Sequence, residues 1–252
     1  TAGPINVYEY GAYAQAARGF VDDRVRLTVS TRVDKITNFE PRISPRVATV
    51  FLLGEKKNHN LRASFQTGYR MPAMRNQYLN LNLGPYRVIG GFQNVFDYHG
   101  LQVENAEGQM VSNAYTTASV NAFRDSGDES DLEKVEMKPI QPEFVRTYEI
   151  GYKGFPIKNL MIDVNAYFNQ YQDFIGNIDF VGPSKERVGT PDQELTTEYL
   201  ADDDSVQYFQ RYVNFDTPVN TQGVSAGFML FLSKRFSVRG NYAWTNIEVD
   251  ES

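Results

Sequence analysis

The chain of 252 residues contains no cysteine. Disulfides, thiolate metal sites and thiol catalysis are therefore excluded. Histidine is almost as scarce. His59 and His99 are the only two, neither has a partner histidine at ligand spacing, and we predict both to be surface residues in turns or loops.

Long apolar runs are missing as well. No stretch of 18 apolar residues occurs, so no transmembrane helix is predicted, and mean hydropathy is −0.46 with a net charge of −6. A β-barrel escapes this test because its strands are only half apolar. The first residues lack the basic and apolar regions of a signal peptide, and we expect the chain to begin within a fold.

Catalytic motifs are absent too: G-x-S-x-G, H-E-x-x-H and a phosphate-binding glycine loop do not occur. We therefore expect no enzyme, no cofactor, no resident metal and no nucleic-acid partner. Acidic residues cluster at 125–131 and 202–204 without the spacing of an EF-hand. A solvated acidic surface is the favoured interpretation, and a cation site is the alternative.

What the sequence does contain is alternation. Residues 144–175 predict one β-hairpin, with a turn at Gly154 to Pro156. In its second arm Leu160, Ile162 and Val164 begin an apolar face that alternates with polar positions, which is typical of a strand. Each arm is about long enough for a tilted transmembrane strand of roughly 9–11 residues. The many aromatic residues, 16 Tyr and 17 Phe, suit the interfacial girdles of a barrel.

Further strands are predicted at 5–16, 24–33, 42–53, 61–70, 206–232, with a bend near Pro218, and 236–244. Between 24 and 33 the odd positions are mostly valine and leucine, and the even ones include three arginines. This pattern fits a barrel wall with a lipid face and a wet lumen. A soluble sandwich with one solvated face is the alternative.

The lengths of the connections favour the barrel. Short turns are expected at 19–23, 54–60, 154–159 and 233–235, whereas the loop at 34–41 and especially those at about 71–142 and 176–205 are longer. Short turns on one side and long loops on the other are typical of outer-membrane barrels. We therefore predict an all-β fold: an antiparallel transmembrane β-barrel segment of about eight strands, with short periplasmic turns and long extracellular loops.

Three stretches resemble TonB-dependent outer-membrane receptors. The strand at 61–70 ends in the Gly-aromatic-Arg-x-Pro pattern at 68–72. The stretch 142–153 resembles P-E-x-x-x-x-Y-E-x-G-Y-K, and 220–225 resembles N-x-G-V-E, with Ser225 in place of the glutamate. MRNQYLNLNLGP, at 74–85, is similar to members from Bacteroidetes. The resemblance covers roughly 42–250.

The resemblance implies a larger barrel of roughly 22 strands filled by an N-terminal plug. No plug signature is present, so the whole chain, 1–252, is expected to be an internal piece of the C-terminal half of the barrel. It implies a receptor that binds a scarce nutrient, most of all a ferric siderophore, and imports it with energy from the TonB complex acting on the plug. Implied partners are outer-membrane lipid and lipopolysaccharide, the small nutrient and a surface lipoprotein.

The candidate ligand-binding residues are loop aromatics and lumen arginines: Tyr78, Tyr86, Phe92, Phe96, Arg62 and Arg70. Packing within the loop and solvation of the wall are the alternatives for these two groups. Two other functions remain open at this point. One is an outer-membrane binding or adhesion barrel without active transport, and the other is a soluble carbohydrate-binding β-sandwich.

Overall fold

A computed structural model describes residues 5–84, 86–105, 107–184 and 194–249. The chain divides into two compact units. Unit 1 comprises residues 1–70, 142–174 and 216–252, and unit 2 comprises 71–141 and 175–215. Among the described residues, every helix is too short or too polar to cross a membrane.

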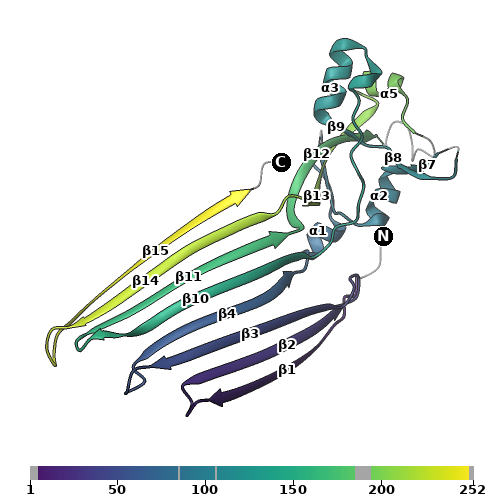
Figure 1. The fold of residues 1–252 in the computed structure, drawn as a ribbon. Coiled ribbons are helices and arrows are strands. Elements are labelled where there is room, and N and C mark those ends of the chain that lie inside the picture. Colours follow the sequence, from purple (N-terminus) through teal and green to yellow (C-terminus); the bar gives the residue numbers. More distant parts are fainter. Residues whose placement is uncertain (1–4, 85, 106, 185–193, 250–252) are drawn as a thin grey trace. The chain divides into compact units, whose positions relative to one another are not determined.

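Unit 1 is one antiparallel sheet of eight long strands (Figure 1). The spatial order is β1-β2-β3-β4-β10-β11-β14-β15, so each strand pairs with its neighbour in the chain except where unit 2 is inserted. The strands are β1 (Glu9–Phe20), β2 (Val25–Ile36), β3 (Arg42–Leu53), β4 (His59–Arg70), β10 (Glu143–Ile157), β11 (Leu160–Gln172), β14 (Val219–Phe231) and β15 (Ser237–Val249). The predicted number of strands is confirmed.

The connections of this sheet are sorted by length. The turns β1–β2, β3–β4, β10–β11 and β14–β15 lie at one end, which we call the turn end. The connections β2–β3, β4–β10 and β11–β14 lie at the other, the loop end. One predicted turn was wrong: Gly154 to Pro156 belong to β10, and the chain turns at Lys158 and Asn159. A register shift between Gly154 and Ile157 accommodates the extra residues as a bulge.

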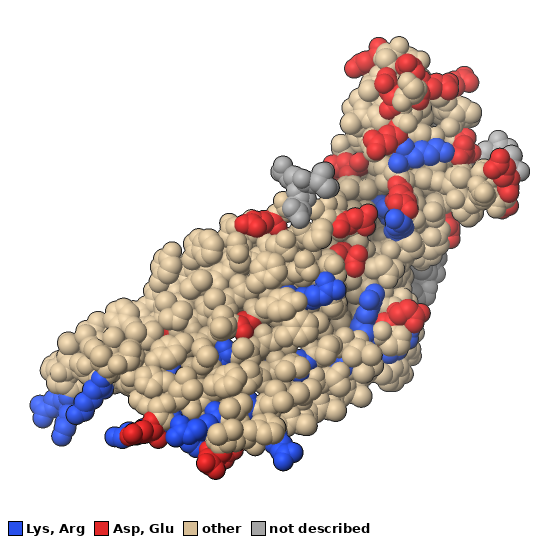
Figure 2. Space-filling view, viewed as in Figure 1, with Lys and Arg blue, Asp and Glu red and all other residues tan. Residues whose placement is uncertain are grey.

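Alternation gives the sheet two distinct faces. Val47, Phe65, Tyr148 and Phe168 lie opposite one another in register on one face, which we call the apolar face. Arg62, on the other side of β4, belongs to the polar face. In the space-filling view the strands show a largely uncharged surface, with charged side chains gathered at the turn end (Figure 2). A sandwich would divide these strands between two packed sheets, so the predicted barrel wall, rather than the sandwich, describes unit 1.

Unit 2 is folded, whereas the sequence predicted two irregular loops. A five-stranded sheet has the order β5-β6-β13-β12-β9, and β7 pairs with β8. The described elements are α1 (Met74–Tyr78), β5 (Asn80–Asn82), β6 (Tyr86–Ile89), α2 (Gln93–His99), β7 (Gln102–Glu104), β8 (Met110–Ser112), β9 (Tyr115–Thr116), α3 (Thr117–Ser126), the short 3-10 helix η1 (Glu129–Asp131), β12 (Phe174–Pro183), α5 (Thr197–Ala201) and β13 (Val206–Phe215). Residues 185–193 of the second predicted loop lie outside the described residues.

The sheet of unit 2 joins both insertions, because β13 pairs in parallel with β6 and β12 pairs with β9. Its core is apolar: the rings of Phe180 and Phe209 stack with centroids 5.2 Å apart, and Phe96 is fully buried. Elements of two to ten residues are too short to show a clear periodicity in the sequence, which is why this unit was not predicted.

The prediction of surface histidines was wrong for His99. His99 ends α2 and is only 1% exposed; its Nε2 lies 3.1 Å from Oδ1 of Asn80, and its ring packs edge-on against Phe209. His59 begins β4, and its Nδ1 lies 2.6 Å from the hydroxyl of Tyr152. Both imidazoles therefore have structural hydrogen bonds.

Candidate functional site

A charged network crosses three strands of the polar face. Arg62 on β4 reaches over β10 and donates a hydrogen bond of 2.9 Å to Asp163 on β11, and Lys153 contacts the same carboxylate at 3.2 Å. The strand between them is crossed at Gly151, where a Cβ atom would lie 2.5 Å from Nε of Arg62. The glycine of the family-like Y-E-x-G-Y-K stretch is thus the place where an arginine passes over the backbone.

The same arrangement recurs at the third family-like stretch, 220–225. Tyr167 on β11 passes over Gly223 of β14, and its hydroxyl lies 2.8 Å from Oγ1 of Thr245 on β15. A Cβ atom at Gly223 would lie 2.5 Å from the tyrosine ring and 2.7 Å from the carbonyl oxygen of Trp244. Both glycines allow a side chain to bridge strands that are not neighbours, which ties the polar face together.

A groove of about 530 Å³ lies at the loop end of the polar face. Its walls are mostly apolar, including Val145, Tyr171 and Val219, and at one side stands the ion pair of Arg70 with Glu143. Nη2 of Arg70 donates to Oε1 of Glu143 at 2.6 Å, and Nε donates to the second oxygen. The volume falls in the range of ligand pockets, roughly 300–1,000 Å³, so the groove can hold an apolar or aromatic part of a small molecule.

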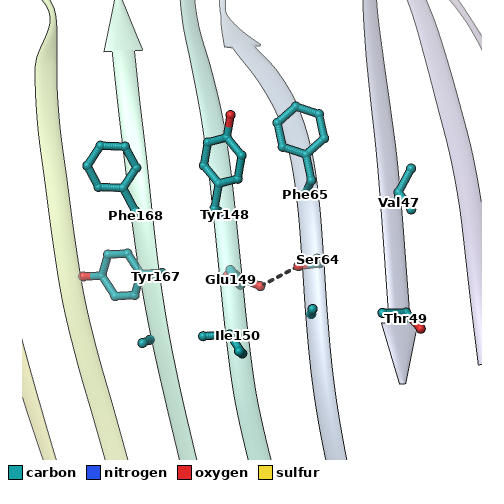
Figure 3. A pocket seen from close by; sticks show the side chains of 11 residues that line it. Val47, Thr49, Ser64, Phe65, Tyr148, Glu149, Ile150, Tyr167 and Phe168 are labelled. Atoms are coloured by element: carbon teal, nitrogen blue, oxygen red, sulfur yellow. Dashed lines mark hydrogen bonds between the residues drawn. The ribbon is translucent and has the colours of Figure 1, made fainter. Parts of the chain in front are cut away.

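A second depression, of about 560 Å³, lies on the apolar face. Figure 3 shows Phe65, Tyr148 and Phe168 side by side on three neighbouring strands. The ring centroids are 5.0 Å apart for Phe65 and Tyr148, and 6.4 Å for Tyr148 and Phe168. The side chains that open into the depression from this face are apolar or aromatic except for one threonine, so it is better explained as the uneven surface of a lipid-facing wall than as a ligand site.

The predicted aromatic residues of unit 2 are not gathered in one place. Phe96 belongs to the core, as the alternative interpretation expected. Tyr78 and Phe92 are half-buried and pack edge to face with centroids 5.0 Å apart. Tyr86 is exposed and lies 5.7 Å from Tyr208. Tyr86 therefore has the most accessible ring of the four.

Two arginines of unit 2 are structural and were not singled out in the sequence. Arg211 is 2% exposed, lies over the ring of Phe96, and donates to the carbonyl oxygens of Glu136 and Lys138 at 2.6 and 3.1 Å. Burial lowers the pKa of Arg211 to about 10. Its guanidinium group replaces the hydrogen bonds that these carbonyls would otherwise make to water.

Arg124 connects α3 to α5 and to the segment that follows it. Its guanidinium donates to the carbonyl oxygen of Leu200 at 2.8 Å, to Asp203 at 2.7 Å and to the hydroxyl of Tyr208 at 3.1 Å. The hydrogen bond from Tyr208, together with that from Arg124, lowers the pKa of Asp203. One acidic residue of the 202–204 run therefore has a cationic partner within unit 2.

The other acidic run also makes local hydrogen bonds. Asp128 accepts from the backbone N–H of Ser130, which lowers its pKa, and Asp131 accepts from Ser126. Among the residues that the structure describes, no three His, Asp or Glu side chains are grouped to hold a metal ion.

The two units differ in formal charge. Unit 2 has eight Lys and Arg and seventeen Asp and Glu, which gives a charge of −9. Unit 1 has seventeen Lys and Arg and fourteen Asp and Glu, which gives a charge of +3.

The solved structures that resemble this chain are outer-membrane transport proteins. The siderophore receptor PirA from Pseudomonas aeruginosa aligns with a TM-score of 0.57 and 12% identity, over 97% of this chain and 35% of that one. The FrpB iron transporter from Neisseria meningitidis aligns with a TM-score of 0.51 and 12% identity, over 96% and 26%. The copper transporter OprC aligns with a TM-score of 0.50 and 14% identity, over 95% and 29%.

The chain thus spans about a third or less of the length of these structures. At such identities the likeness concerns the fold. A comparison with curated proteins found no match.

The family model described as TonB dependent receptor-like, beta-barrel, matches residues 1–252. This family and its structural relatives are proteins of the Gram-negative outer membrane, which agrees with the two faces of unit 1. The chain belongs to the TonB-dependent receptors and forms part of their β-barrel.

Proposed function

We propose that the parent protein is an outer-membrane receptor that imports a scarce nutrient with energy from the TonB complex. A ferric siderophore or similar metal chelate is the favoured cargo. Family membership supports this assignment, and the related structures are described as a siderophore receptor, an iron transporter and a copper transporter. The TonB complex would act through a plug domain outside this chain.

Within that receptor, unit 1 supplies wall strands, and unit 2 supplies the extracellular surface where the cargo first binds. The predicted loops at about 71–142 and 176–205 thus correspond to a folded extracellular unit. The observation that carries this division of roles is the sorting of connections: both insertions that build unit 2 leave the sheet at its loop end. In outer-membrane barrels, long connections face the outside of the cell.

The cargo site would include the groove beside Arg70, with Tyr171 as an aromatic wall. Unit 2, taken by itself, would offer a separate candidate surface, with the accessible ring of Tyr86 and the half-buried pair of Tyr78 and Phe92. Phe96 would act only through the packing of the core. Arg62 would hold the wall rather than touch the cargo, because its guanidinium is engaged with Asp163.

The test uses the full-length receptor, expressed in a Gram-negative strain that lacks its own siderophore receptors. Uptake of radioactive iron is measured for a panel of ferric siderophores, with and without a functional TonB complex. TonB-dependent uptake of at least one chelate supports the proposal. Surface binding without uptake would favour the alternative of a binding barrel, and neither binding nor uptake of any metal chelate would refute the metal cargo.

Two matched variants locate the site. Tyr171→Ala removes an aromatic wall of the groove, and Tyr148→Ala removes a tyrosine from the opposite, apolar face. We expect Tyr171→Ala to weaken binding by roughly tenfold, since a stacked ring contributes about 1 kcal/mol or more. Tyr148→Ala should bind as the wild type. Equal effects of both variants would place the cargo elsewhere.

A further inference from the structure

The polar face of unit 1 becomes apolar near the loop end. One row of side chains across β4, β10, β11, β14 and β15 consists of Gly68, Val145, Tyr171, Val219 and Val249. The next row of this face toward the turn end consists of Gln66, Thr147, Asn169, Thr221 and Ile247. Apolar side chains on a face that is otherwise polar indicate a surface that another molecule covers.

The groove beside Arg70 lies along this apolar row. Val145, Tyr171 and Val219 are half-buried, and Ile247 is 65% exposed. Gly68 leaves space at the β4 side of the groove. A Cβ atom there would meet only Cγ1 of Val145, at 3.5 Å, within the described residues. The groove is therefore open to a ligand, and a larger side chain at Gly68 would fill part of it.

Polar side chains that line the groove already have partners. Glu143 accepts two hydrogen bonds from Arg70, and Oγ1 of Thr221 accepts one from Nδ2 of Asn169 at 3.0 Å. A polar ligand group placed in the groove would lose its hydrogen bonds to water and gain few in return. The groove therefore favours an aliphatic chain over a catechol, a hydroxamate or a sugar.

Arg70 offers a donor at one side of the groove. Its side chain is 67% exposed. Nε and Nη2 are bound to Glu143, whereas Nη1 makes no hydrogen bond within the part of the chain that the structure describes. Nη1 can therefore donate to a carbonyl or carboxylate oxygen of a ligand. An apolar groove with an exposed donor beside it suits a molecule that has an apolar chain and a polar head group.

We propose that the cargo is an amphiphilic metal chelate, whose acyl chain lies in the groove and whose metal-binding head group lies beside Arg70. This inference rests on the proposed function and specifies the class of chelate. The groove lies at the loop end, which faces the outside of the cell in outer-membrane barrels, so an arriving chelate would meet it early. From Gly68 to Val219 the row crosses three strand spacings, or about 14 Å, which exceeds the length of an octanoyl chain.

The experiment measures binding to the full-length receptor in lipid nanodiscs by titration calorimetry. The two probes are ferric complexes of one linear trihydroxamate, with either an acetyl or an octanoyl group on its terminal amine. The test variant is Gly68→Val, which fills the groove. The matched control is Gly227→Val on the same face, where the nearest atoms to a new Cβ would be 3.8 Å and 3.9 Å away. Partition of the probes into the bilayer is the same for both variants.

In the wild type and the control we expect the octanoyl complex to bind about sixtyfold more tightly than the acetyl complex. A fully buried methylene group raises the affinity about fourfold, and an open groove covers about half of the six methylene groups that the longer chain adds. Gly68→Val should reduce the ratio below about tenfold. Equal affinities of the wild type for the two complexes would overturn the proposal, because another part of the receptor would then fill the groove. An unchanged ratio in Gly68→Val would overturn it as well.

Val219→Thr provides a second test should Gly68→Val not insert. It keeps the shape of the side chain and adds a hydroxyl group to the groove wall, so it should weaken binding of the octanoyl complex by about fivefold and leave the acetyl complex unchanged. An unchanged affinity for the octanoyl complex would count against the groove.

The proposed import is judged separately, by uptake of the siderophore panel. TonB-dependent uptake without any preference for the octanoyl chain would refute the amphiphilic cargo and leave import intact. Chain-dependent binding without uptake of any chelate would support the groove and refute import.

Discussion

Replacing Gly223 by alanine tests whether the strand-crossing tyrosine matters to the wall. The new Cβ atom would lie 2.5 Å from the ring of Tyr167 and 2.7 Å from the carbonyl oxygen of Trp244. The carbonyl belongs to a paired strand and cannot move freely. Overpacking of this kind costs about 1–3 kcal/mol, and displacing the tyrosine also loses its hydrogen bond to Thr245, which contributes about 1 kcal/mol.

The expected destabilisation is therefore about 2–4 kcal/mol. It is measured by urea unfolding of the full-length receptor in phospholipid vesicles, followed by tryptophan fluorescence. The matched control is Gly227→Ala, which lies four residues, or two periods of the alternation, further along the same face of β14. There the nearest atoms to a new Cβ would be 3.8 Å and 3.9 Å away, so the free energy of unfolding should change by less than about 0.5 kcal/mol.

A double variant separates the two contributions. With Tyr167→Ala present, Gly223→Ala meets only the carbonyl oxygen, and its cost should fall by about 1 kcal/mol or more. Equal stability of the wild type and Gly223→Ala would refute the reasoning, because it would mean that the ring does not lie over the glycine. Equal costs at Gly223 and Gly227 would refute it as well.

Three further changes have defined outcomes. Arg70→Ala should lower the free energy of unfolding by about 3 kcal/mol in urea titration, because the carboxylate of Glu143, 5% exposed, loses two charge-assisted hydrogen bonds; an unchanged midpoint would contradict this. Arg211→Met should destabilise unit 2 by about 2 kcal/mol, since two part-buried hydrogen bonds to carbonyl oxygens are lost, and faster limited proteolysis of unit 2 measures it. The hydrogen bond from Tyr208 keeps the pKa of Asp203 below 3.8, so its stabilisation is present at neutral pH and is lost as pH falls below about 4. Proteolysis between pH 3 and 6 should show this loss in the wild type and not in Asp203→Asn.

The wall could be predicted from the sequence because each of its strands carries its own signal. The alternation from Leu160 to Phe168 and the lengths of the connections depend only on local order. The turn was misplaced because Pro156 suggested a turn. In the structure this proline lies in a bulge near the end of β10, where a strand tolerates a proline. Sequence order alone did not show that Arg62 meets Asp163, since this contact requires three strands in register.

Unit 2 was missed for a different reason. Its strands pair residues from separate insertions, such as Tyr86 with Tyr208, and no local pattern indicates such a pair. The burial of His99 follows from this packing against Phe209, and the role of Arg211 follows from the carbonyls of the 136–138 segment. A composition rich in Asp, Glu and Tyr suggested a solvated loop, although enough apolar residues were present to form a core.

The pairing of β6 with β13 also has a mechanical meaning. The hairpin β10–β11 leaves unit 2 and returns to it, so the pairs β6–β13 and β9–β12 close the chain into a non-covalent ring around that hairpin. A pulling force on either end of the chain would be carried by these pairs before it reached the two strands inside the ring. The hairpin is thus shielded from tension applied along the chain, and it should be among the last wall strands to detach.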